Sequence, residues 1–164
     1  MTGRLESINA SRGGVPKRSM FEALLTDAGI DGDRQRDLRF HGGPDRAIVL
    51  FSLEVIRTLQ REGHPIAAGT TGENLTVSGL DWNAIVPGTE LQIGEVRLRI
   101  TKYTTPCEQI AFSFFDNDYT RILQTLHPCC SRLSARVLAG GLVRLGDAVE
   151  VSAPSPRAGP PGAP

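Results

Sequence analysis

Cys107 is the residue of this chain best suited to chemistry. It lies in residues 103–109 (YTTPCEQ), where a strand predicted for residues 95–102 ends in a loop. A thiol at a strand end is held by the sheet yet stays open to ligands, and its thiolate is both a nucleophile and a soft metal ligand. Free cysteine is also commonly buried as a small apolar side chain. From the local sequence alone, Cys107 is therefore either a reactive thiol or a core residue.

The densest polar segment, residues 31–46 (DGDRQRDLRFHGGPDR), could bind an anion. Its four arginines and His41 can present planar donors to a phosphate or carboxylate, and its paired glycines allow close backbone approach to a ligand. The alternative is a solvated turn whose charges neutralise one another. In that case His41 is a hydrogen-bonded structural residue.

Residues 70–76 (TTGENLT) bring hydroxyls, a carboxylate and an amide into one turn. Such a turn could bind the polar edge of a heterocycle. Equally, Glu73 and Asn74 could tie the loop to neighbouring backbone groups. The sequence leaves both interpretations open.

Cys129 and Cys130 are adjacent, and adjacent cysteines can form a disulfide with each other only in strained backbone geometry. No histidine or further thiol lies at metal-ligand spacing from them, so we expect a structural role. A resolving role towards Cys107 requires a fold that brings the thiols close together. The chain contains no Ser/His/Asp motif, Walker loop or dinucleotide-binding glycine fingerprint.

The elements that must position these residues are short, and the turns between them are recognisable from their glycine and proline residues. Strands are predicted at residues 4–10, 46–51, 91–93, 95–102, 135–139 and 148–152, and helices at residues 53–62, after the N-cap Ser52, and 117–126. Residues 19–30 are ambiguous between helix and strand. Gly94-Glu95 is a glycine-first hairpin turn, and Gly140-Gly141 and Gly146-Asp147 are further turns. Many strands with two helices, and no regular strand-helix alternation, favour a mainly β fold, a closed or nearly closed mixed β-barrel.

Length and composition indicate one domain, residues 1–152, followed by a disordered Pro/Gly-rich tail, residues 153–164. The 18 basic and 18 acidic residues balance, so no overall field draws the protein onto nucleic acid or an anionic membrane. We see no signal peptide and no membrane-spanning run, and the three cysteines do not form a disulfide framework. We therefore expect a cytoplasmic protein.

Four motifs, taken in order, closely resemble the MOSC domain family, named after the C-terminal part of molybdenum cofactor sulfurase. They are residues 41–47 (HGGPDRA), residues 72–76 (GENLT), Pro106-Cys107, and residues 135–140 (ARVLAG) followed by Gly146-Asp147. The resemblance covers residues 4–152 and implies a MOSC-type β-barrel.

The resemblance implies roles for individual residues. The family's Pro-Cys cysteine, which is thought to carry a persulfide or to ligate molybdenum in a pyranopterin cofactor, corresponds to Cys107. The residues that would bind the molybdenum cofactor (molybdopterin) or form an anion-binding wall around it are Arg34, His41, Gly42, Gly43, Arg46, Gly72, Glu73, Asn74 and Thr105.

The chain also departs from the family pattern. Family members often carry Gly-Arg-x-Gly shortly before the Ala-Arg-Val-Leu strand, whereas residues 129–134 read CCSRLS. This departure weakens any claim about a ligand contact there. The pyridoxal-phosphate desulfurase domain of the full sulfurase and the companion barrel of the amidoxime-reducing relatives are absent from this sequence. With only Lys17 and Lys102 as lysines, we do not expect autonomous pyridoxal-phosphate binding, so a sulfur donor would act in trans.

Three functions remain compatible with the sequence. Cys107 could accept sulfane sulfur as a persulfide and pass it on, which would make the protein a sulfur transferase or sulfur carrier. It could instead ligate molybdenum in a small oxidoreductase that reduces N-hydroxylated substrates with an electron-transfer partner. Alternatively, the barrel could be a non-catalytic module that binds a ligand or a partner.

Overall fold

The strand that leads to Cys107 is one arm of a tight hairpin. β7 (Glu90–Ile93) and β8 (Val96–Tyr103) pair antiparallel, and Ile93 lies opposite Val96. The two residues between them form the turn, in which Gly94 has a φ of 57°, a left-handed conformation that favours glycine. The predicted hairpin is therefore confirmed.

The alternating pattern of β8 separates an apolar face from a cationic one. The apolar residues at positions 96, 98 and 100 are buried, whereas Arg97 and Arg99 are half-buried. Both arginines form ion pairs with Glu90 on β7, at 3.2 and 2.7 Å respectively. Glu90 is only 1 % exposed, so one buried carboxylate is shared by the two arginines on the cationic face of β8.

The computed structural model describes residues 1–11, 15–32 and 43–152 of the chain. Its remaining strands are β1 (Thr2–Ala10), β2 (Arg18–Met20), β3 (Glu22–Thr26), β4 (Gly29–Ile30), β5 (Ile48–Ser52), β6 (Leu75–Ser78), β9 (Leu133–Ala139), β10 (Gly141–Arg144) and β11 (Ala148–Ser152). The described part contains one α-helix, α1 (Leu53–Arg61), and five short 3-10 segments. These are η1 (Pro44–Arg46), η2 (Trp82–Ala84), η3 (Glu108–Ser113), η4 (Phe115–Asn117) and η5 (Tyr119–Ile122).

Seven strands close into a barrel. The larger sheet runs in the order β11-β7-β8-β9-β5-β6-β1-β2, and an additional pairing of β11 with β1 completes the ring. Neighbouring strands of the ring are antiparallel except β5 and β6, which are parallel. The prediction of a mainly β, mixed β-barrel is thus confirmed.

The parallel pair β5 and β6 requires a crossover, and α1 provides it. The side chain of Ser52 caps the helix by accepting a hydrogen bond from the Val55 amide at 3.2 Å. Gly63, with a φ of 98°, follows the end of the helix. This helix agrees with its prediction. The chain then returns through residues 64–74, so the crossover delivers the loop that contains Glu73 and Asn74 to the start of β6.

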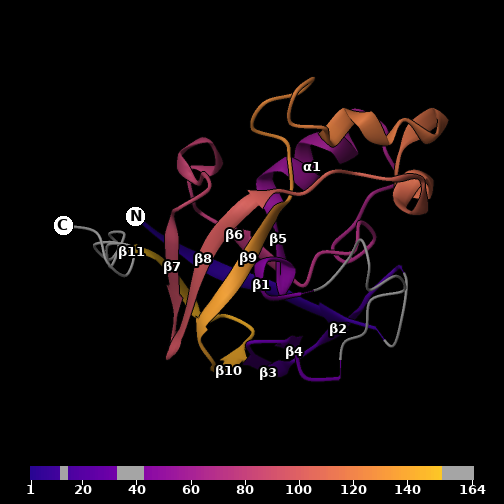
Figure 1. The fold of residues 1–164 in the computed structure, drawn as a ribbon. Helices are drawn as coiled ribbons and strands as arrows, with labels where there is room; N and C mark the ends of the chain where they lie inside the picture. Colours follow the sequence, from indigo (N-terminus) through magenta and orange to yellow (C-terminus); the bar gives the residue numbers. More distant parts are fainter. Residues whose placement is uncertain (12–14, 33–42, 153–164) are drawn as a thin grey trace.

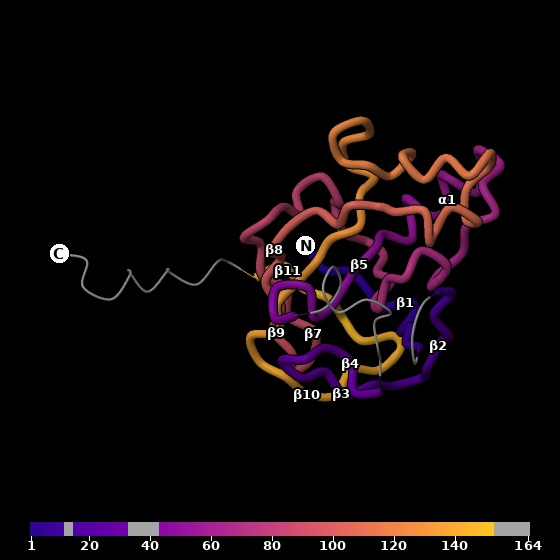
Figure 2. The backbone as a smooth tube through the Cα atoms, turned by 45° about the vertical axis from the view of Figure 1, so that its right-hand side comes forward, coloured from indigo at the N-terminus to yellow at the C-terminus, as the bar shows by residue number. Residues whose placement is uncertain are grey.

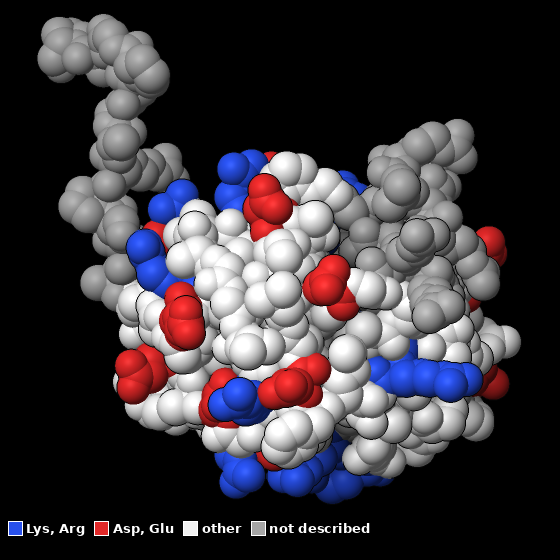
Figure 3. Space-filling model, turned by 90° about the horizontal axis from the view of Figure 1, so that it is seen from below, with Lys and Arg blue, Asp and Glu red and all other residues white. Residues whose placement is uncertain are grey.

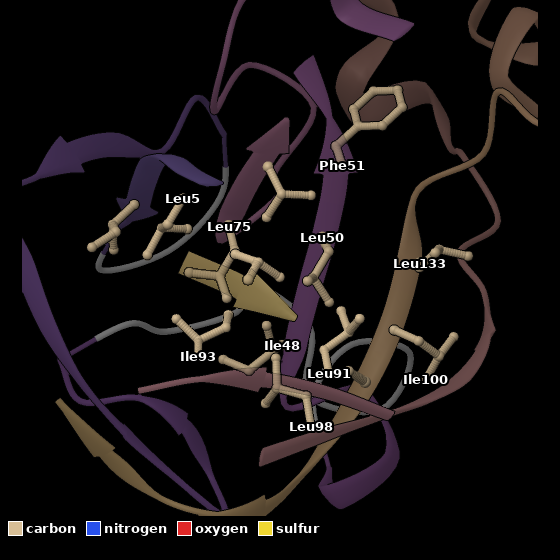
Figure 4. Packing of buried hydrophobic residues seen from close by; sticks show 14 of the residues in the cluster. Leu5, Ile48, Leu50, Phe51, Leu75, Leu91, Ile93, Leu98, Ile100 and Leu133 are labelled. Atoms are coloured by element: carbon tan, nitrogen blue, oxygen red, sulfur yellow. The ribbon is translucent and has the colours of Figure 1, made fainter. Parts of the chain in front are cut away.

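Apolar side chains from opposite sides of the ring fill its interior (Figure 4). Ile48 and Leu50 of β5 face Leu91 of β7 and Leu98 of β8 there, and all four are completely buried. Each such side chain removed from water contributes about 1.5 to 3 kcal/mol. This core holds the strand ends, from which the loops of the candidate site emerge, in fixed positions.

The two ends of the barrel carry different structures (Figures 1 and 2). α1 and the segment that follows β8 cover the upper end, and a second sheet of order β10-β3-β4 lies at the lower end. Residues 19–30, which the sequence left ambiguous, are therefore strands. β10 begins at Gly141, where the sequence predicted only a turn.

The predicted helix at residues 117–126 is wrong. Asp116 and Asn117 have positive φ values of 55° and 56°, which interrupt a right-handed helix. The following amides bond to carbonyls three residues earlier, as in Arg121 to Asp118 and Leu123 to Thr120, so the segment forms 3-10 turns. Leu126, expected to face inward, is 61 % exposed.

Viewed from the lower end, charged side chains of both signs surround a largely uncharged centre (Figure 3). The small sheet and its flanks contribute exposed apolar residues there, namely Phe21, Leu24, Leu142 and Leu145. Basic side chains gather along the lower edge of this view, whereas acidic side chains are scattered over the face (Figure 3). None of the helices in residues 1–11, 15–32 and 43–152 is long and apolar enough to cross a bilayer. The predicted tail, residues 153–164, lies outside the described residues.

Candidate functional site

Cys107 follows the end of β8 at the upper end of the barrel. The backbone before it is fixed to the opposite strand, because the amide of Thr104 donates to the carbonyl of Arg132 at 2.9 Å. The Thr104 hydroxyl also bonds to the hydroxyl of Ser134 at 2.8 Å. Cys107 itself is half-buried and free, and its side chain does not cap η3. The thiol is therefore anchored by a rigid strand end without being sealed in the core.

A buried arginine lies beside this thiol. Arg132, which directly precedes β9, is only 6 % exposed. Its Nη1 donates to the carbonyl of Thr71 at 2.5 Å and its Nη2 donates to the carbonyl of Thr105 at 3.4 Å. The guanidinium thus bridges the two loops that contain Glu73 and Cys107. Its Nε is buried and has no hydrogen-bond partner among the described residues.

Arg132 interacts electrostatically with two neighbouring groups, Glu73 and Cys107. Burial lowers the pKa of Arg132 to about 10, and electrostatic attraction to Glu73 and to Cys107 limits this decrease. A pKa near this value keeps the guanidinium protonated at neutral pH. Cys107 therefore lies within the field of a desolvated positive charge.

Glu73 is the buried carboxyl of the site, with no exposed surface. It accepts hydrogen bonds from the amide of Gly69 and the hydroxyl of Thr71. Burial raises the pKa of Glu73 above its usual value of 4.5, although these hydrogen bonds and Arg132 act in the opposite direction. Desolvation thus outweighs the attraction to Arg132, as is common for buried ion pairs.

Asn74 fastens the same loop to the barrel. Its Oδ1 accepts from the Val49 amide at 2.9 Å, and its Nδ2 donates to the Asn9 carbonyl at 3.4 Å. Asn74 is completely buried. Of the two interpretations that the sequence left open, the structure shows that the side chains of Glu73 and Asn74 tie the loop to backbone groups.

Replacing Asn74 with alanine should destabilise the barrel by about 2 to 3 kcal/mol, because the Val49 amide and the Asn9 carbonyl each lose a partner inside the protein. Urea unfolding followed by circular dichroism measures this change. Asn83→Ala, at an exposed position of η2, is the matched control and should change the free energy of unfolding by less than about 0.5 kcal/mol. Equal effects of the two substitutions would contradict the fastening role of Asn74.

The two loops also touch beyond Arg132. The hydroxyl of Ser113, in η3, donates to the carbonyl of Thr70 at 3.2 Å. η3 begins directly after Cys107, whose carbonyl accepts from the Ile110 amide at 3.2 Å. The fold therefore brings the Cys107 loop and the 70–74 loop together, although they are more than 30 residues apart in the sequence. Gly72, within the 70–74 loop, has a φ of 79°.

Part of the predicted anion-binding wall also lies near the end of β8. Asp45 of η1 binds Arg136 at 2.9 Å, and its carbonyl accepts a hydrogen bond from Thr101. Burial lowers the pKa of Lys102, and repulsion from Arg46 lowers it further, against the attraction of Asp45. Arg46 and Lys102 are thus close enough to form a local positive field on the strand that leads to Cys107.

Of the predicted site residues not yet placed, the structure describes Gly43 and Thr105. Gly43 is exposed, has a φ of 80° and precedes η1. The side chain of Thr105 is exposed, and its carbonyl binds Arg132. Arg34, His41 and Gly42 lie outside the described residues.

Sequence reasoning missed Arg132. The residue was noticed only as part of a departure from the family motif, although one signal was available. It directly precedes a strand whose first three residues, Leu133, Ser134 and Ala135, are buried on both faces, and an arginine at such a position must find buried partners. Within the described ranges, no group of three or more His, Cys, Asp or Glu residues could hold a metal ion.

Comparison with known proteins agrees with this fold. The model of the MOSC domain family matches residues 37–150. The chain is 29 % identical to protein YiiM of Escherichia coli over 107 residues, which are 63 % of this chain and 48 % of YiiM. It is 31 % identical over 103 residues to the uncharacterized protein YflK of Bacillus subtilis, covering 62 % of this chain and 47 % of YflK. The chain thus spans about half the length of these curated relatives.

Solved structures show the same architecture. The crystal structure of YiiM from Geobacillus stearothermophilus superposes with a TM-score of 0.73 at 23 % identity, over 92 % of this chain and 75 % of that one. The YUAD protein from Bacillus subtilis gives a TM-score of 0.69 at 20 % identity, over 92 % of this chain and 96 % of that one. At 23 % and 20 % identity, these structures show a shared fold only. The family model, in contrast, matches most of the sequence. The chain belongs to the MOSC domain family.

Proposed function

We propose that this protein carries sulfane sulfur as a persulfide on Cys107 and binds the molybdenum cofactor beside that thiol. The observation that carries the proposal is the proximity of a half-buried, free thiol to the buried guanidinium of Arg132. The thiolate is the nucleophilic form of cysteine, and Arg132 supplies a positive charge close to Cys107. The same charge would stabilise a persulfide anion at this position.

The transfer needs no external oxidant if the donor is itself a persulfide. The Cys107 thiolate attacks the outer sulfur of the donor, and a new S–S bond forms while the donor's S–S bond breaks. The donor leaves as a thiolate, and Cys107 retains one additional sulfur atom. Passing this sulfur to an acceptor thiolate repeats the exchange in the opposite direction. A desulfurase acting in trans could supply such a donor.

The residues present are compatible with a molybdenum-pterin group. Cys107 offers a soft thiolate ligand for the metal, and the Nε of Arg132 is a buried donor without a partner among the described residues. The positive field of Arg46 and Lys102 suits the anionic phosphate of a pterin cofactor. When bound, the group would supply redox chemistry at the metal that protein side chains lack. The family resemblance implies Arg34, His41 and Gly42 as further cofactor-binding residues, and they lie outside the described residues.

Loading the wild-type protein tests the proposal. The protein is purified anaerobically, incubated with a small-molecule persulfide, digested and analysed by mass spectrometry. We expect one additional sulfur atom on the peptide that contains Cys107, and a separate sample exposed to free molybdenum cofactor should retain pterin fluorescence and molybdenum. We expect a cytoplasmic location, because free thiols such as these stay reduced in that compartment. Cell fractionation would test this expectation.

Other outcomes would favour the alternative functions. Molybdenum retained without any sulfane adduct would favour the small oxidoreductase, in which Cys107 ligates the metal and an electron-transfer partner delivers electrons. Absence of both the adduct and the cofactor after loading would overturn the proposal and favour a non-catalytic binding module.

A further inference from the structure

A second thiol site lies apart from Cys107. A cavity of about 260 Å³ opens between the first turns of α1 and η2, and both Cys129 and Cys130 line it. Its apolar lining includes Val55, Leu59 and Trp82. Cys107 does not line this cavity, so the two thiol sites are separate.

Cys130 is the thiol of this cavity that has a charged partner. Arg121 donates from Nη1 to the Cys130 sulfur at 3.4 Å, and its Nη2 binds both carboxylate oxygens of Glu62 at 3.0 Å. Burial alone would lower the pKa of Arg121, but the hydrogen bonds to Cys130 and Glu62 outweigh it and raise this pKa. Glu62 thus holds the guanidinium of Arg121 against the Cys130 sulfur. Cys129, in contrast, is exposed.

An unused hydrogen-bond acceptor lies in a hollow that adjoins this cavity. A smaller hollow of about 30 Å³ shares Trp82, Asn83 and Cys129 with the larger one, and Gln124 lines it. The Oε1 of Gln124 is buried and has no hydrogen-bond partner within the described part of the chain. A buried acceptor without a donor costs free energy. A ligand that brings an N–H group into this hollow would remove that cost.

Charge around the cavity points to the same kind of ligand. Glu54 and Asp81 line it with carboxylates, whereas the positive charge of Arg121 is matched by Glu62. The lining therefore combines apolar side chains with two carboxylates, which suits a short apolar molecule with an ammonium group and disfavours an anion.

We propose that this cavity is a thiol-exchange site in which Cys130 forms a mixed disulfide with a small amine-bearing disulfide. The Cys130 thiolate attacks one sulfur of the ligand, and the ligand's S–S bond breaks as the new S–S bond forms. The departing half takes up a proton and leaves as a free aminothiol. Cys130 is oxidised and that half of the ligand is reduced, so the electrons balance.

Three disulfides of similar length test this proposal: cystamine, which is cationic, hydroxyethyl disulfide, which is neutral, and dithiodipropionic acid, which is anionic. Each is incubated with the full-length protein in a Cys107→Ser background, and the modified cysteine is identified by mass spectrometry. The rate at which each disulfide modifies the protein is divided by the rate at which it modifies an unstructured cysteine peptide. We expect cystamine to modify Cys130 on the order of tenfold faster than the anionic disulfide, with the neutral one between them. Equal normalised rates would overturn the proposal.

Two sets of variants make the test independent of folding defects. Cys130→Ser should abolish the adduct, whereas Cys129→Ser, which removes the neighbouring exposed thiol, should retain it. Gln124→Leu should reduce the advantage of cystamine over hydroxyethyl disulfide. An adduct found on Cys129 instead would contradict the assignment. Because all measurements lack Cys107, their outcome does not depend on the function proposed for that residue.

Discussion

Cys107→Ser should lose the persulfide completely, and any sulfur-transfer activity should fall by a factor on the order of 10³ or more. A serine hydroxyl has nearly the same shape as the thiol, but it cannot form an S–S bond and is not ionised at neutral pH. The half-buried position of Cys107 at a strand end tolerates this change. The loss should therefore appear in the chemistry and leave the melting temperature nearly unchanged. Mass spectrometry after loading, and sulfur release to an acceptor thiol, measure both steps.

Cys129→Ser is the matched control for this substitution. It also replaces a free thiol by a hydroxyl, but Arg132 is linked electrostatically to Cys107 and not to Cys129. We expect the control to load sulfur on Cys107 as the wild-type protein does. Undiminished transfer by Cys107→Ser would show that another group carries the sulfur.

Glu73→Ala should have the largest effect on stability, lowering the free energy of unfolding by about 3 to 5 kcal/mol. The substitution removes the acceptor of the Gly69 amide and the Thr71 hydroxyl, leaves a cavity, and deprives the buried Arg132 guanidinium of a compensating charge. Urea unfolding at neutral pH measures the difference. Arg132→Met added to Glu73→Ala should recover part of the loss, because the uncompensated charge is then absent.

Glu73→Gln separates the hydrogen bonds from the charge. Glutamine can still accept from the Gly69 amide and donate to the Thr71 hydroxyl, so we expect it to be far less destabilising than alanine. Burial raises the pKa of Glu73 above 4.5 in the folded state. The folded protein then binds this proton more tightly than the unfolded chain does, so the contribution is fully present below the unfolded value. It is lost as the pH rises through the raised folded value.

Titrating stability between weakly acidic and neutral pH checks this sign. The wild-type protein should lose part of its free energy of unfolding over that range relative to Glu73→Gln, which lacks the titrating group. A difference between the two proteins that grows in the opposite direction would show that attraction to Arg132 outweighs burial.

Much of the barrel could be predicted because local signals were strong. The alternating residues of β8, the glycine-first turn at Gly94, and the capped helix that begins after Ser52 each depend on neighbours within a few positions. The segment at residues 117–126 had a helical apolar spacing, but left-handed residues at Asp116 and Asn117 and the packing of the loop produced 3-10 turns. Backbone conformations of this kind are selected by tertiary contacts and leave a weak trace in the sequence.

The sequence by itself determined the mainly β class and the hairpin that leads to Cys107. Its four ordered motifs also indicated the MOSC domain family. Only the tertiary structure decided which side chains surround that thiol. Arg132 reaches the carbonyls of Thr71 and Thr105 across two loops, and it interacts electrostatically with Glu73 where both side chains are buried. Such a contact depends on the closure of the barrel, which joins residues far apart in the chain. The energy of a buried charge depends on every group around it, so no spacing along the sequence could have predicted it.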